Sequence, residues 1–210
     1  EHTEAAGAFK QASELEPDNI EMNLEYITEL IELKMNNEAL KNVNKIIEIY
    51  PHSSKAHYLY GLVNHKLKEN DKAIKILGKA LEFDANNISI YKLLGKIYSD
   101  KKLYKEALEK YRLFAEKGPF DAEAALETAK IYLEQGLPDA VIETVKKIIN
   151  EAADNNVQAI SLTGGEPFIF FDELIEILHH CDKRGIIYSR TGTNGFLFQD
   201  PDKNDFYDRV

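Results

Sequence analysis

The small and hydrophobic residues of this chain recur with a fixed period of about 34 residues. Alanine stands at positions 5, 39, 73 and 107, and the same register carries Pro17, Pro51, Ala85 and Pro119. After each alanine, apolar side chains follow at spacings of four and three, which places them on one helical face. A second apolar face precedes each alanine. Each copy is therefore predicted to be a pair of antiparallel helices, and the period indicates stacked pairs.

The first helix of each pair carries a small residue, at Gly61, Gly95 and Ala129. A small side chain there lets a neighbouring helix approach closely, and proline after the second helix ends that helix. With its 34-residue period, this pattern resembles the tetratricopeptide repeat family over about residues 4–150. The resemblance implies a mainly α fold, an α-solenoid, whose first helices line a concave groove for a protein or peptide.

The resemblance also implies which residues line this groove. They are Leu24, Thr28, Lys55, Tyr58, Leu62, His65, Lys92, Lys96, Leu126 and Lys130. The alternative for each is that it packs in the seam between repeats. Some family members clamp a C-terminal carboxylate with lysine and asparagine, but Leu24, Thr28, Leu59 and Leu93 stand at the matching positions here. We therefore expect a different peptide ligand.

The pattern changes after Gly136. A long helix is predicted from about Pro138 to Ala153, followed by an alternating strand over 157–162, an amphipathic helix over 171–182 and a second strand over 186–188. This order predicts a partial βαβ unit with parallel strands. We expect a repeat array over 1–137, an α/β segment over 138–198 and a polar tail over 199–210.

Two glycine-containing motifs follow the two predicted strands. Gly164, Gly165, Glu166 and Pro167 follow the first strand, and Thr193 and Asn194 follow the second. Open α/β sheets bind ligands at the carboxyl ends of their strands. Over about 138–200 the two motifs resemble the radical S-adenosylmethionine enzymes. The resemblance implies that these six residues contact the cofactor, with the Gly-Gly-Glu-Pro segment on the amino group of its methionine part.

That family holds a 4Fe-4S cluster on three cysteines in a CxxxCxxC loop that precedes the Gly-Gly-Glu-Pro segment. This chain has one cysteine, Cys181, and iron–sulfur clusters need thiolate ligands. We therefore expect no catalytic residue and no cofactor in this chain, and the cluster and S-adenosylmethionine are implied by the resemblance alone. His179, His180 and Cys181 are adjacent on a helix and converge poorly on one metal ion. We expect no metal site.

Charge and hydropathy narrow the choice of partners. The formal net charge of −10 argues against a nucleic-acid partner. Residues 54–121 are basic, with 14 Lys and Arg against 9 Asp and Glu, which can steer an acidic peptide or form a solvated face. No apolar run is long enough for a membrane helix.

A single cysteine favours a reducing, cytoplasmic setting. The chain does not begin with Met and has no cluster loop before Gly164, and whether it is a fragment, a fusion or a mis-assembly stays open.

Three functions remain open. The first is a protein-binding or peptide-binding scaffold with a truncated, inactive radical-enzyme-like segment. The second is a piece of a radical S-adenosylmethionine enzyme whose repeats recruit a protein or peptide substrate. The third is an assembly protein that self-associates through its terminal repeat or open sheet edge. Because two strands bury little surface alone, residues 155–210 are expected to lean on the last repeat helix, pair with another copy or be poorly ordered.

Overall fold

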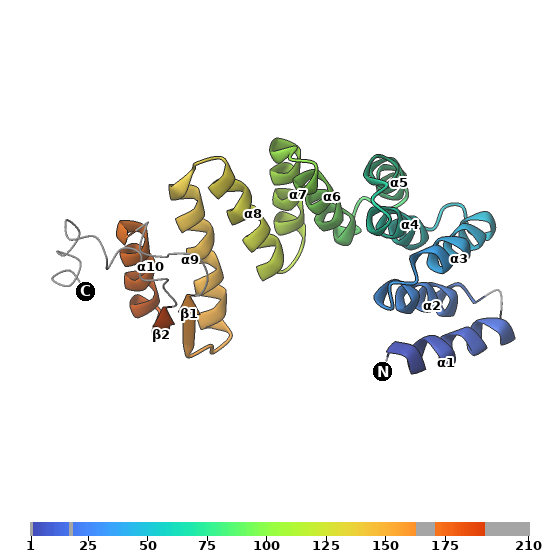
Figure 1. The fold of residues 1–210 in the computed structure, drawn as a ribbon, viewed down its shortest axis with the longest axis horizontal. Helices are drawn as coiled ribbons and strands as arrows, with labels where there is room; N and C mark the ends of the chain where they lie inside the picture. The colour runs from blue at the N-terminus through green and yellow to red at the C-terminus, as the bar shows by residue number, and fades with distance from the viewer. Residues whose placement is uncertain (1, 17–18, 163–170, 192–210) are drawn as a thin grey trace, which may run out of the picture. The chain divides into compact units, whose positions relative to one another are not determined.

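The computed structural model describes residues 2–16, 19–162 and 171–191 (Figure 1). The Gly164–Pro167 segment and the Thr193–Asn194 pair lie outside these residues. The chain divides into two compact units, Glu1–Pro119 and Phe120–Val210. This division comes earlier than the boundary at 137/138 that the sequence analysis placed.

The first unit consists of paired helices. In the described residues they are α1 (His2–Leu15), α2 (Ile20–Glu32), α3 (Asn36–Ile49), α4 (Ser54–Lys66), α5 (Asn70–Phe83), α6 (Ile88–Asp100) and α7 (Tyr104–Lys117). Each even-numbered helix packs against the helix that follows it, and α2, α4 and α6 also contact one another in succession (Figure 1). The predicted stack of helix pairs is confirmed.

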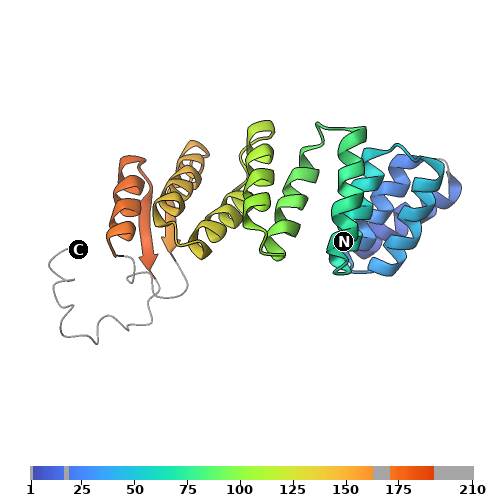
Figure 2. The ribbon, with the colours of Figure 1, turned by 90° about the horizontal axis from the view of Figure 1, so that it is seen from above.

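The second unit begins with another helix pair and continues into an α/β segment. Its described elements are α8 (Ala122–Glu134), α9 (Pro138–Asp154), β1 (Ala159–Leu162), α10 (Phe171–Lys183) and β2 (Ile187–Thr191). The strands pair in parallel, with Ala159 opposite Ile187, and α10 lies between them in the chain. Figure 2 shows α9, α10 and the two strands side by side.

Helix starts follow the 34-residue period because a capping residue recurs with it. Asn19, Ser53 and Asp121 each accept a hydrogen bond from the backbone N–H three residues later. Asn87 occupies the same register before α6, without a side-chain cap bond. Such caps satisfy amide groups that the first helical turn leaves unpaired. They therefore determine where α2, α4 and α8 begin.

The turn inside each pair is a backbone feature that recurs with the same period. Lys34, Lys68, Lys102 and Gly136 have φ of 61°, 67°, 58° and 68°. In each turn the next amide bonds back to the preceding helix, as Met35 N–H does to the Leu30 carbonyl at 2.8 Å. This left-handed helix ending is one that glycine adopts without strain. Gly136 keeps the register, so α9 begins in phase with α3, α5 and α7. Our expectation that the period fails directly after Gly136 was wrong in this respect.

Close helix packing occurs where the sequence predicted it. A Cβ atom on Gly61 of α4 would lie 2.6 Å from Leu77 Cδ2 of α5, and one on Gly95 of α6 would lie 2.8 Å from Tyr111 Cε1 of α7. The alanines at positions 39, 73 and 107 are all 0% exposed. Each glycine thus opens a space that a large side chain of the partner helix fills.

In the second unit, α9 supports the α/β segment. Ile149 of α9, Cys181 of α10 and Ile186 form a buried apolar cluster. Polar contacts flank it: Lys146 Nζ lies 2.7 Å from Glu176 Oε1, and His180 Nε2 lies 2.9 Å from Asn150 Oδ1. Arg184 pairs with Asp154 one turn further on. The expectation that the later residues lean on the last repeat helix is confirmed for α10 and Ile186.

We predict opposite effects for two glycine-to-alanine substitutions in the first unit. Gly61→Ala should lower the unfolding free energy by about 1–2 kcal/mol, because the new methyl group overlaps the fully buried Leu77. Gly78→Ala should raise it by about 0.5–1 kcal/mol, because nothing lies within 4 Å of that site and alanine favours helix. Chemical denaturation monitored by circular dichroism measures both. Equal effects would contradict the close approach at Gly61.

A second pair of substitutions tests the left-handed turns. Gly136→Ala should destabilise by about 1 kcal/mol, because the left-handed conformation strains any residue with a Cβ. Lys102→Gly should be neutral or stabilise by a few tenths of a kcal/mol, since relief of the same strain offsets the greater freedom of glycine in the unfolded chain. Thermal unfolding of both variants provides the measurement. A stabilised Gly136→Ala variant would refute the assigned turn.

Candidate peptide-binding surface

The surface formed by α2, α4 and α6 in the first unit contains most of the residues that the sequence analysis placed in a groove. Polar contacts cross it at two points. Lys55 Nζ of α4 lies 2.9 Å from Glu25 Oε1 of α2, and His65 Nε2 of α4 lies 3.7 Å from Asp100 Oδ2 of α6. These contacts link α2 to α4 and α4 to α6. We call the exposed part of α2, α4 and α6 the first-helix surface.

Tyr58 and Leu62 are the apolar centre of the first-helix surface. Both are half-buried, and both pack against the core of the first helix pairs and against the core around α5 and α6. Burial raises the pKa of Tyr58, while the nearby charge of Lys92 opposes this increase. The phenol is therefore neutral at ordinary pH. One face of each side chain remains open to a ligand.

Lysines surround this apolar centre. Lys55 and Lys96 are exposed, and Lys92 is half-buried with its Nζ 5.9 Å from the centroid of the Phe114 ring. An ammonium group over an aromatic ring is held in place while keeping its charge. The α4 and α6 part of the surface thus combines apolar contact area with the positive charges of Lys92 and Lys96, while Lys55 is paired with Glu25.

Two residues predicted for the groove are buried instead. Leu24 is 3% exposed and His65 is 6% exposed. Leu24 belongs to the core of the first helix pairs, and His65 Nδ1 lies 2.9 Å from Asn70 Oδ1 at the start of α5. Both therefore pack between helices, which is the alternative that the sequence analysis gave for each groove residue. Thr28 is half-buried, and its hydroxyl donates to the Leu24 carbonyl.

The predicted groove residues of the second unit lie on α8. Leu126 is 49% exposed, and Leu133, further along the same helix, is 56% exposed. Lys130 lies between them, and its Nζ is 2.7 Å from Glu127 Oε1. This helix therefore presents apolar side chains around a paired lysine.

Comparison with protein families identifies the helix pairs. Two family models described as tetratricopeptide repeat match residues 30–97 and 93–156. The chain contains tetratricopeptide repeats. A third model, described as a 4Fe-4S single cluster domain, matches residues 128–210, which include α9, α10 and both strands. No curated protein matches the chain.

Solved structures share the fold of the tetratricopeptide repeats. The crystal structure of MamA is 22% identical, with a TM-score of 0.63 over 72% of this chain and 88% of that chain. TTC0263, a TPR protein of Thermus thermophilus, is 14% identical, with a TM-score of 0.66 over 85% of this chain and 90% of that one. YrrB, described as a TPR protein with an unusual peptide-binding site, is 18% identical, with a TM-score of 0.56 over 85% and 91%.

Sequence reasoning missed the acidic side chains that pair across the repeats, Glu25 and Asp71. Lys55 pairs with Glu25, and Lys101 pairs with Asp71, and the sequence separation is 30 in both pairs. Glu25 and Lys55 lie on the first helices of consecutive pairs, whereas Asp71 lies on α5 and Lys101 directly follows α6. Which charges meet therefore depends on how the helices pack, and the 34-residue period alone did not indicate these pairs.

The residues that could hold metal or a cluster do not gather in the part of the chain that the structure describes. His180 contacts Asn150, whereas Cys181 is 1% exposed inside the apolar cluster with Ile149. Burial raises the pKa of the Cys181 thiol, which favours the neutral form over the thiolate that binds iron. Among the described residues, no group of three or more His, Cys, Asp or Glu side chains is arranged for a metal ion. The one thiol of this chain does not fit a 4Fe-4S cluster.

Among the described helices, none combines the length and the hydropathy that crossing a bilayer needs.

Proposed function

We propose that the tetratricopeptide repeats of the first unit bind an acidic peptide along the first-helix surface. The observation that carries this proposal is the position of Tyr58 and Leu62, which are half-buried apolar side chains flanked by lysines. Such side chains supply contact area for apolar residues of a peptide, while the ammonium groups attract its carboxylates. The basic composition of residues 54–121 also favours a negatively charged ligand.

Lys96 is the residue on which we would test this function. Lys96→Gln should weaken binding of acidic peptides about threefold to fivefold, because one exposed charge interaction is lost. Lys79→Gln removes the same charge from an exposed position on α5, outside the first-helix surface, and should leave binding unchanged. Fluorescence anisotropy with a library of labelled acidic peptides, at about physiological salt, measures both variants. Equal loss in the two variants, or no binding to the unchanged protein, would disprove the proposal.

For the second unit we propose common ancestry with the radical S-adenosylmethionine enzymes. The supporting observations are the parallel strands on either side of α10 and the match to a 4Fe-4S cluster domain model over residues 128–210. The expected cofactor contacts at Gly164–Pro167 and at Thr193 and Asn194 remain proposals. Since the chain supplies one buried thiol, we propose no reaction at a cluster held by this chain alone. Recruitment of a peptide substrate by the repeats of a larger enzyme is the second candidate function.

Anaerobic reconstitution tests whether this chain alone can hold a cluster. Incubation of this chain with iron and sulfide should give no stoichiometric cluster, because one thiolate cannot hold four irons. In the same sample, Cys181 should resist alkylation until denaturant is added, since it is buried in the α9–α10 cluster. Absorbance spectroscopy and mass spectrometry provide the two measurements. Stoichiometric cluster uptake would favour the enzyme.

A further inference from the structure

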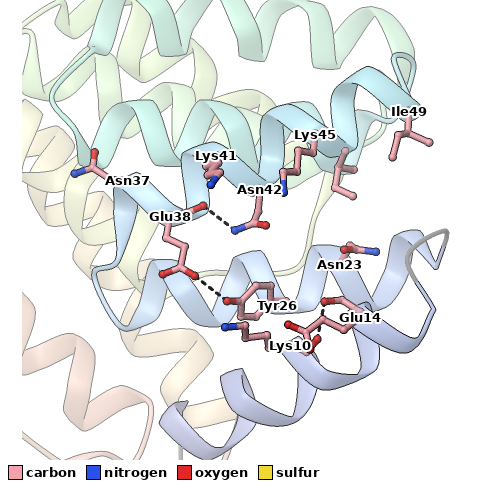
Figure 3. A pocket seen from close by; sticks show the side chains of 12 residues that line it. Lys10, Glu14, Asn23, Tyr26, Asn37, Glu38, Lys41, Asn42, Lys45 and Ile49 are labelled. Carbon is pink, nitrogen blue, oxygen red and sulfur yellow. Dashed lines mark hydrogen bonds between the residues drawn. The ribbon is translucent and has the colours of Figure 1, made fainter.

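A cavity lies between α1, α2 and α3 on a part of the first unit that does not include the first-helix surface (Figure 3). Its volume is about 650 Å³. Sites for small molecules and cofactors have volumes of about 300–1,000 Å³. α1 and α3 form its walls, and α2 contributes Asn23 and Tyr26. The cavity is open to solvent on one side, since Lys10, Glu14, Lys41 and Lys45 are exposed, and it is large enough for a small organic ligand.

A buried tyrosine, hydrogen-bonded to a glutamate, lines one side of this cavity. The Tyr26 hydroxyl donates to Glu38 Oε1 at 3.0 Å, as Figure 3 shows. Burial and this bond raise the pKa of Tyr26 to about 12, so the hydroxyl remains protonated and continues to donate. Glu38 is therefore held by the protein.

Four other charged side chains border the cavity and take part in no ion pair among the described residues. Lys10 and Glu14 come from α1, and Lys41 and Lys45 come from α3. Lys41 and Lys45 are one turn apart on the same helix, where like charges repel each other. A bound anion would relieve this repulsion. Glu14 adds a single negative charge on the opposite wall.

This pattern of charges matches a ligand with two carboxylates and one ammonium group. Two or three lysines can contact the carboxylates, and Glu14 can contact the ammonium group. Ile46 and Ile49, which also line the cavity, suit the methylene groups between the charges. A polyphosphate or nucleic acid has no cationic group to meet Glu14, and a simple cation has no anionic group to meet the lysines, so both match the lining less well.

We propose that the cavity between α1, α2 and α3 binds an α-amino dicarboxylate, either as the free amino acid or as the N-terminal residue of a peptide. The proposal is independent of peptide binding at the first-helix surface, because the two sites share no residue.

Nuclear magnetic resonance on the full chain tests the ligand class. Titration with glutamate should shift amide signals of α1 and α3, with weaker binding of glutarate, which lacks the ammonium group, and of inorganic phosphate. A peptide with a free N-terminal glutamate and its acetylated form distinguish the two sources of the ligand, since acetylation removes the ammonium charge. Glutarate or phosphate binding as tightly as glutamate, or no saturable shift with glutamate or with the free peptide, would overturn the proposal.

The repeat itself provides a matched control. Lys41→Gln combined with Lys45→Gln should weaken glutamate binding about tenfold, since two ion pairs are lost. Lys75→Gln combined with Lys79→Gln changes the equivalent positions of α5, one period later, and should leave binding unchanged. Equal weakening by both double variants would show general charge attraction and would refute the site.

Glu14→Gln provides a readout that does not depend on the lysines. This variant should bind glutamate and glutarate equally, because the carboxylate that distinguishes them has been removed. Retained preference for glutamate would contradict the assigned role of Glu14. Circular dichroism of each variant establishes that the helices are intact, and Lys96→Gln, which alters the first-helix surface, should leave glutamate binding unchanged.

Discussion

The packing of one large side chain over one glycine constrains the helix pairs α4–α5 and α6–α7. Leu77 occupies the space above Gly61, and Tyr111 occupies the space above Gly95. Because the interior is close-packed, each of these two pairs has one register in which such a side chain fits. The caps and left-handed turns recur in the same 34-residue phase, so local structure and packing specify the same arrangement. Agreement between these levels is what makes a sequence fold to one structure.

α9 packs against two other helices of the second unit, α8 and α10. It begins in phase with the other second helices and packs against α8, as a repeat helix does. Its other face carries Lys146, Asn150 and Asp154 in successive turns. Their partners are Glu176 and His180 of α10 and Arg184, which directly follows α10, and these have the same spacing. These contacts run in the same order along both helices, so α9 and α10 are parallel. Two helices that are connected through a single strand have this relative direction. Two strands alone would bury too little surface, and α9 supplies the missing layer.

The sequence predicted the fold better than it predicted the surfaces. The 34-residue period was sufficient for the helix pairs, because it records caps, turns and the close approach at glycine. Groove residues such as Leu24 and His65 were misplaced, because exposure depends on how neighbouring helices cross and not on the position in the repeat alone. The cavity beside Tyr26 was not predicted at all. Its walls come from α1 and α3, and their separation depends on the size of side chains that the period does not specify.

The next repeat differs from the first helices at residues that line the cavity. One period after Tyr26 and Glu38 stand Tyr60 and Lys72. The ring and the charged group still meet, but Lys72 Nζ lies 5.3 Å from the Tyr60 ring centroid, so a cation over a ring replaces the hydrogen bond to a carboxylate. The position of Asn42, which lines the cavity, is taken by the buried Ile76. Equivalent positions of consecutive repeats thus still meet, while the residues at them change the contact from a hydrogen bond to a cation over a ring.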